Sequence, residues 1–141
     1  MEWMLLPLKR YADFSGRSRR MEYWMFHLGI LIAYFVLFAV AGVLGGLAPE
    51  DGAARSGASL LVGGLFFVLI IGIIVPSLAV QVRRFHDLDK SGWSILLGLI
   101  PLVGGIIVLV FMCTRGTPGP NSYGDDPLDP ELEGNLGEVF R

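Results

Sequence analysis

The densest group of polar side chains in this sequence lies in the segment Arg83–Trp93, between two long apolar stretches. It holds a histidine beside an aspartate, His86 and Asp87, a combination that in other settings ligates a metal or moves protons. The two residues are adjacent, so a helix would not place them on one face, and the segment offers no second histidine or cysteine. We therefore interpret it as an ion-paired turn with Glu22, His86 and Asp87 as structural residues, and we predict no metal site and no cofactor.

A second candidate site consists of arginines from the N-terminal segment and from this turn. The planar guanidinium group suits phosphate, and each such charge contributes about 1 kcal/mol to binding at an anionic membrane surface. The candidate residues for anionic-lipid binding are Arg17, Arg19, Arg20, Arg83 and Arg84. The same charges also form a topology signal, and both interpretations stay open. Nucleic acid is not an expected partner, because the net charge of −2 is small and no recognition motif is present.

Two acids, Glu22 and Asp87, lie among these arginines in the sequence. We predict that one of them pairs with Arg17, Arg20, Arg83 or Arg84 and fixes the N-terminal segment to the helices. Partial shielding from water would make such a pair stronger than an exposed salt bridge.

Patterns typical of catalysis are missing from the sequence. It has no glycine-rich phosphate loop, no Ser-His-Asp set and no zinc spacing. The single cysteine, Cys113, follows an apolar run and cannot form a disulfide within the chain. We therefore expect no catalytic residues and no enzymatic activity.

Three stretches without a charged residue must position these polar groups. They lie between Glu22 and Glu50, between Arg55 and Arg83, and between Lys90 and Arg115. Each exceeds the roughly 20 apolar residues that cross a hydrocarbon core of about 30 Å as a helix. The composition, 53% hydrophobic and 17% charged, agrees with a membrane protein. We predict an all-α integral membrane protein with three transmembrane helices over residues 25–47, 60–82 and 93–113.

The distribution of lysine and arginine predicts an orientation. Eight of the eleven lie in the N-terminal segment and in the loop 83–92, so three spans would place both of these segments in the cytoplasm. The tail after the third span would then lie on the opposite side. Pro101 and the pair Gly104-Gly105 interrupt the third stretch, and the alternative is a re-entrant hairpin that returns the tail to the cytoplasm.

The two ends of the chain differ in composition from the membrane domain 25–113. In residues 1–24, bulky side chains recur at helical spacing, which predicts a short amphipathic helix at the membrane interface. These side chains are Trp3, Pro7, Tyr11 and Phe14. Residues 114–141 are rich in glycine, proline and acid, which predicts a loop-like, flexible tail that is most mobile over about its last dozen residues.

Glycines in the apolar stretches would permit close contact between helices. Gly42 and Gly46 have the four-residue spacing of helix interfaces, and Gly104 and Gly105 interrupt the third stretch. These patterns fit packing within the chain as well as self-association. The spans hold no Asp, Glu, Lys or Arg, which argues against a pump or coupled transporter.

Several blocks of the sequence together resemble a known family. They are Phe14–Trp24, Pro76–Trp93, Ile100–Gly104 and Asn121–Pro127. In this order and spacing they are similar to the bacterial inner-membrane family catalogued as domain of unknown function 805. The resemblance departs from the family pattern at Leu88, Asp89 and Trp93. It implies a multi-pass helical protein of the bacterial inner membrane, and it implies no activity, because the family has none assigned.

These observations lead to one functional expectation and one alternative. We expect a non-enzymatic accessory or interaction subunit, with its N-terminus in the cytoplasm, that contacts membrane lipids and packs against itself or a larger membrane complex. The alternative is an oligomeric channel or small-solute facilitator, in which Tyr34, Ser77, Gln81 and Ser94 would line a shared lumen.

Overall fold

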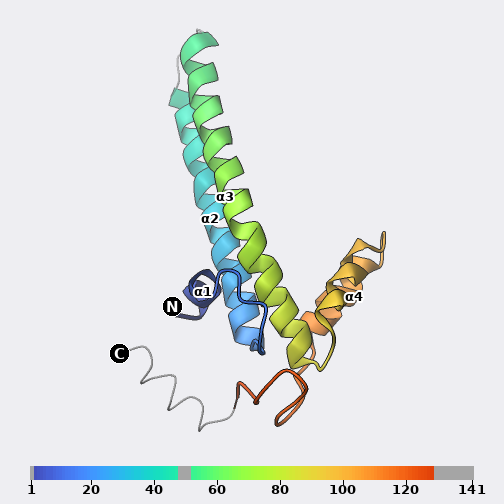
Figure 1. Cartoon of the computed structure of the whole chain (residues 1–141). Helices are drawn as coiled ribbons and strands as arrows, with labels where there is room; N and C mark the ends of the chain where they lie inside the picture. Colours follow the sequence, from blue (N-terminus) through green and yellow to red (C-terminus); the bar gives the residue numbers. More distant parts are fainter. Residues whose placement is uncertain (1, 48–51, 129–141) are drawn as a thin grey trace.

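The computed structural model of the chain describes residues 2–47 and 52–128 (Figure 1). Within these ranges every regular element is helical, and extended structure is limited to a single bridge between Asn121 and Gly124. The elements are α1 (Glu2–Lys9), α2 (Arg20–Leu47), α3 (Gly52–Asp87), the 3₁₀ helix η1 (Gly92–Leu99) and α4 (Gly104–Cys113).

Helices α2 and α3 form a long antiparallel pair (Figure 1). They contain the predicted spans 25–47 and 60–82, and in the described residues they are the two helices that are long and apolar enough to cross a membrane. Their large side chains face outward on every side; Phe35 and Leu61, for example, are 75% and 78% exposed. Apolar helices with so little internal burial require an apolar solvent, as a bilayer provides.

The third apolar stretch is not one transmembrane helix, and the prediction of a span over 93–113 is wrong in this respect. It forms a helical hairpin of η1 and α4, which contact each other, joined by a tight turn around Pro101 and Leu102. Each arm rises only about 15 Å, roughly half of a hydrocarbon core. The hairpin starts and ends at the same end of the α2–α3 pair (Figure 1).

The break has a local cause in the sequence. Pro101 disfavours helical geometry at the preceding residue, and Ile100 is extended, with φ −70° and ψ 118°. Leu102 then adopts a positive φ of 68° at the tip of the hairpin, where it is 96% exposed. Gly104 returns the chain so closely past η1 that a Cβ would collide with the Leu97 carbonyl oxygen. The arms can therefore meet only with glycine at this position.

A small core holds the hairpin against the end of α3. Phe85 of α3 and Met112 of α4 are fully buried, and Val108 of α4 packs with them. The Phe85 and Phe111 rings meet edge to face, with centroids 6.0 Å apart. Burial in this molecule is thus concentrated where α3, the hairpin and the N-terminal segment meet.

The N-terminal helix is shorter than the predicted stripe. It ends at Lys9, so Tyr11 and Phe14 lie beyond it in the connection to α2. The helix packs on α2, where Gly29 makes room for Met4: a Cβ on Gly29 would lie 2.9 Å from the Met4 methyl carbon.

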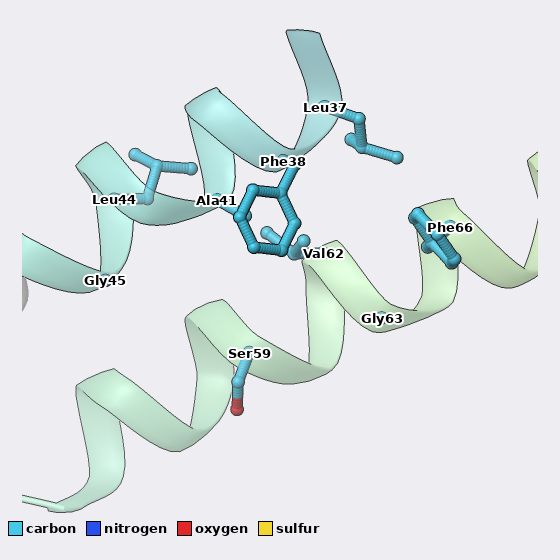
Figure 2. Close-up of a pocket in the computed structure, with 9 residues that line it drawn as sticks. All are labelled: Leu37, Phe38, Ala41, Leu44, Gly45, Ser59, Val62, Gly63 and Phe66. Atoms are coloured by element: carbon cyan, nitrogen blue, oxygen red, sulfur yellow. The ribbon is translucent and has the colours of Figure 1, made fainter. Parts of the chain in front are cut away.

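At the far end, α2 and α3 leave an apolar groove between them of about 470 Å³. Figure 2 shows its walls, with Leu37, Phe38 and Leu44 on α2 and Val62 and Phe66 on α3. Gly45 and Gly63 also border the groove and contribute no side chain to fill it (Figure 2). We call this feature the far groove.

Candidate functional site

Five charged residues come together at the end opposite the far groove. These residues, which we call the charge cluster, are Arg17, Glu22, Arg83, Arg84 and Asp87. None of them is more than 7% exposed. Charged side chains are almost never buried to this degree unless they are paired, so their partners determine what the cluster does.

Asp87, the last residue of α3, is the centre of the cluster. Its Oδ1 accepts from Arg17, with Nη2 at 2.9 Å and Nε at 3.0 Å. Its Oδ2 accepts from Nη1 of Arg84, one turn earlier on the same helix. Gly116 of the tail lies directly against this carboxylate, where any side chain would collide. An acid at a helix C-terminus is unfavourable by itself, and the two guanidinium groups offset that cost.

Glu22, in the first turn of α2, forms the second pair. Arg83 Nη2 donates to its Oε1 at 2.9 Å, and the Ser18 hydroxyl donates to its Oε2 at 2.7 Å. The same arginine reaches the backbone of the N-terminal segment, because Nη1 donates to the Asp13 carbonyl at 3.0 Å. The predicted pairing of Glu22 with one of the arginines is confirmed, and Arg83 fixes both the start of α2 and the segment at Asp13 to the end of α3.

Residues 114–128 fold back onto the cluster rather than extending from the third segment. Arg17 donates through Nη1 to the Gly119 carbonyl and through Nη2 to the Thr117 carbonyl, both at 2.6 Å. Asn121 Nδ2 donates to the His86 carbonyl at 2.8 Å. This part of the tail lies at the same end as the N-terminal segment, so its predicted place on the opposite side is wrong. Residues 129–141, where the greatest mobility was expected, lie outside the described residues.

His86 belongs to the same end but forms no ion pair among the described contacts. Its ring stacks on that of Tyr123, with centroids 3.9 Å apart and planes 4° apart. Its Nδ1 lies 3.2 Å from the Gly16 carbonyl oxygen. Gly16 has a positive φ of 73°, which lets the chain present that carbonyl. His86 therefore joins the N-terminal segment to the tail through stacking and one hydrogen bond.

Two further acids stabilise the loops around the cluster. The Ser15 hydroxyl, and to a lesser extent Arg10, lower the pKa of Asp13 to about 2. The pKa of Asp126 is lowered chiefly by the Leu128 N–H, together with the Gly119 N–H and the nearby Arg17 and Arg115. Both carboxylates are therefore ionised at neutral pH.

The five candidate lipid-binding arginines separate into two groups. Arg17, Arg83 and Arg84 are buried and donate to acids and carbonyls of the chain itself. Arg20 is exposed, and its Nη1 lies 3.3 Å from the Cys113 carbonyl oxygen. Arg19 and Arg20 border a cavity of about 780 Å³, which we call the polar cavity, between the start of α2, the end of α4 and the tail.

The candidate packing glycines also differ from one another. Gly104 makes the close hairpin contact described above. A Cβ placed on Gly42, Gly46 or Gly105 would meet nothing within 4 Å. Among the described residues, no three His, Cys, Asp or Glu side chains come together as a possible metal site.

Sequence reasoning missed the part of the tail that completes the cluster. Thr117, Gly119 and Asn121 act mainly through backbone carbonyls and one amide, and such groups have no signature in hydrophobic periodicity. The sequence signal for this role was the block Asn121–Pro127. It is rich in turn residues, and it follows the Arg83–Trp93 segment in the family-like order described above.

The exposed apolar helices and the internally paired charge cluster define a helical membrane protein, and comparisons with known proteins agree. The family described as "Protein of unknown function (DUF805)" matches residues 11–125. The chain belongs to this family.

Two similar proteins from Escherichia coli strain K12 have names that state a location in the inner membrane. "Inner membrane protein YhaH" is 44% identical over 131 residues, which cover 92% of this chain and 100% of the relative. "Inner membrane protein YhaI" is 39% identical over 127 residues, covering 90% of this chain and 96% of the relative. No solved structure matches the chain.

Proposed function

We propose that the protein is a non-enzymatic accessory or interaction subunit of the bacterial cytoplasmic membrane. In this proposal the charge cluster is a structural clasp and faces the cytoplasm. The apolar surface of α2 and α3 is the part that meets other helices. One observation carries the proposal. The buried charges are paired within the chain, whereas the apolar side chains of α2 and α3 are largely exposed and free to contact another helix.

The charge cluster offers little to a substrate. The carboxylates of Asp87 and Glu22 accept from Arg17, Arg84, Arg83 and Ser18, and they are buried. A general acid or base must reach a proton on a bound substrate, and a carboxylate enclosed by two donors cannot do so without breaking the fold. This supports a structural role for the cluster.

The far end of the α2–α3 pair has the properties of a helix-docking surface. Gly42 and Gly46 lie on an exposed part of α2 where a partner helix could approach closely. The far groove next to them is apolar and lined by Phe38 and Phe66. In lipid, helices associate through such close packing, because burial of apolar surface gives no net gain there.

A channel is the second candidate and has weaker support. Tyr34 lies against the Phe66 ring, with centroids 5.2 Å apart, between the two long helices. The polar cavity and the far groove are lined by other residues than Ser77, Gln81 and Ser94. A lumen would therefore have to form between several copies.

The orientation of the cluster is proposed from the positive-inside rule. The fold gathers every described lysine and arginine except Arg55 at the cluster end, while Arg55 lies in the first turns of α3. Such asymmetry favours a cytoplasmic location for this end. The hairpin of η1 and α4 would then enter the bilayer from the cytoplasm and return to it.

Cysteine labelling tests this orientation in a Cys113→Ser background. Ser15→Cys and Ser122→Cys sample the exposed surface of the cluster end, and Ser56→Cys samples the other end of α3. A membrane-impermeant thiol reagent should label Ser56→Cys in intact cells and the other two only in inverted vesicles. Labelling of Ser122→Cys from the same side as Ser56→Cys would contradict the hairpin.

Mild-detergent purification from the native membrane tests the interaction role. We expect the protein to co-purify with itself or with one defined membrane complex, and Gly42→Leu with Gly46→Leu to abolish this association. Gly105→Leu is the matched control, because Gly105 is also uncontacted within the chain but lies on α4.

Flux assays on the reconstituted protein test the alternative, a channel. Saturable flux that disappears with Gln81→Ala and Ser77→Ala would establish the channel instead.

A further inference from the structure

The polar cavity lies where the charged end of the molecule meets the apolar helices. One wall is the start of α2, another is the end of α4 at Cys113, and a third is the tail segment that folds back. The cavity is distinct from the charge cluster, although Arg84 and Asp87 of the cluster form part of its floor. Its volume of about 780 Å³ is within the range of ligand pockets in proteins.

The charge on the walls favours an anion. Four arginines line the cavity, Arg19, Arg20, Arg84 and Arg115, against two aspartates. Asp87 is already neutralised by Arg17 and Arg84. Asp126 lies 4.0 Å from Arg17 and accepts the Gly119 N–H, so its charge is partly compensated within the chain.

Arg84 forms part of the floor of the cavity with a buried guanidinium group. It is fully buried, and both of its terminal nitrogens are satisfied, by Asp87 and by the Thr114 carbonyl. Its Nε is also buried and has no hydrogen-bond partner within the described ranges 2–47 and 52–128. The Nε of Arg83, which does not border the cavity, is in the same state, so these donors do not mark a ligand position and the case for a ligand rests on the charge and shape of the cavity.

The remaining wall is apolar. Met21, Trp24 and Met25 form it, on the first two turns of α2, and Leu128 closes it from the tail. Tryptophan is enriched at the level of lipid headgroups, and beyond Trp24 the helix contains no Asp, Glu, Lys or Arg. A ligand in this cavity thus meets cations on one side and a path along an apolar helix on the other.

We propose that the polar cavity binds the phosphate headgroup of an anionic phospholipid, with Arg20 and Arg115 as its main ligands and the acyl chains lying along α2. The proposal rests on the membrane placement proposed above but requires no protein partner. It narrows the sequence-based set of lipid ligands to the arginines that border the cavity. It also adds Arg115, which that set did not contain.

The test measures lipid binding to the purified protein by native mass spectrometry. The detergent-solubilised chain is titrated with phosphatidylglycerol, with phosphatidylcholine and with inorganic phosphate. We expect one phosphatidylglycerol to bind per chain, in preference to phosphatidylcholine. We also expect Arg20→Gln with Arg115→Gln to weaken binding about 25-fold, at about fivefold for each arginine.

Lys9→Gln with Lys90→Gln is the matched control. It removes the same charge from the same end of the molecule, at residues that do not border the cavity. Equal losses in the two double variants, or equal binding of phosphatidylcholine, would overturn the proposal. Binding of inorganic phosphate as tight as that of phosphatidylglycerol would reassign the ligand to a soluble phosphate and overturn the lipid form.

Two further variants separate lost binding from lost structure. Arg20→Lys with Arg115→Lys keeps both charges and should retain most of the binding. Asp126→Asn removes a negative charge from the cavity wall and should raise the affinity for phosphatidylglycerol. A misfolded protein would not bind more tightly, so a fall in affinity with Asp126→Asn in a protein of unchanged melting temperature would count against the site. Because the assay uses the isolated chain, its result does not depend on whether the protein has an accessory role.

Discussion

The two ends of the α2–α3 pair are built on opposite principles. At the cluster end, Phe85 and five charged residues are buried, and each of the two acids is paired with one arginine from a distant part of the chain. At the far end, Phe38 is 78% exposed beside an apolar groove bordered by glycine. The first end is completed by the chain itself, whereas the second needs lipid or another helix. The difference separates what stabilises the fold from what is available for interaction.

The strongest test of this comparison removes the central charge of the cluster. Asp87→Asn would leave Arg84 buried without a counter-charge and Arg17 with only the more distant Asp126, and we expect the free energy of unfolding to fall by about 3–5 kcal/mol. The measurement is denaturation in detergent, by heat or by sodium dodecyl sulfate. Asp89→Asn is the control, because Asp89 is exposed and asparagine also tolerates its positive φ of 54°. A loss no larger than that of Asp89→Asn would mean that the cluster is not a clasp.

Replacing one phenylalanine at each end tests the comparison directly. Phe85→Ala opens a cavity in a closed core, for which a loss of about 3–5 kcal/mol is typical. Phe38→Ala should change the free energy of unfolding by less than about 1 kcal/mol, because its ring is mostly exposed. The same denaturation assay measures both variants. Similar losses at the two positions would show that the far end is as tightly packed as the cluster end.

The hairpin offers a paired test with two adjacent glycines. Gly104→Ala would push a methyl group into the Leu97 carbonyl oxygen, and overpacking of this kind typically costs about 1–3 kcal/mol. Gly105→Ala meets nothing within 4 Å and should be neutral or slightly stabilising, since alanine favours helix. Thermal unfolding in detergent distinguishes them. If both variants behave alike, the two arms are farther apart than the structure has them.

The smallest expected effect concerns Asp13, beside the cluster. Its pKa is lowered to about 2, below the value near 3.9 in an unfolded chain, so its ionised form stabilises the folded state above pH 4. That contribution is lost as the pH falls through this range toward 2. Because the side chain is partly exposed, we expect Asp13→Asn to cost less than about 1 kcal/mol at pH 7. The gap between wild type and variant should narrow as the pH is lowered from 4 to 2 in melting experiments.

The sequence allowed the long helices and the charged pairs to be predicted, because both depend on residue type. Uninterrupted apolar runs indicate α2 and α3, and Glu22 and Asp87 are two of the few acids near the arginines. The hairpin was considered only as an alternative, since Pro101 is compatible with a spanning helix as well as with a turn. The decisive contact is that of Gly104 with the Leu97 carbonyl, which is a matter of backbone geometry. The role of the tail likewise depends on carbonyls that any residue possesses.

The contacts of Arg17 have a consequence for how the protein is made. Its partner Asp87 follows it by 70 residues, and the Thr117 carbonyl follows it by 100. At a synthesis rate of about 5–20 residues per second, Arg17 leaves the ribosome roughly 4–14 s before Asp87 does. During that interval the guanidinium group must stay in water or among lipid headgroups, and α2 cannot settle against α3. The nascent chain therefore acquires its final arrangement late, after the segment that ends at Leu128 has emerged.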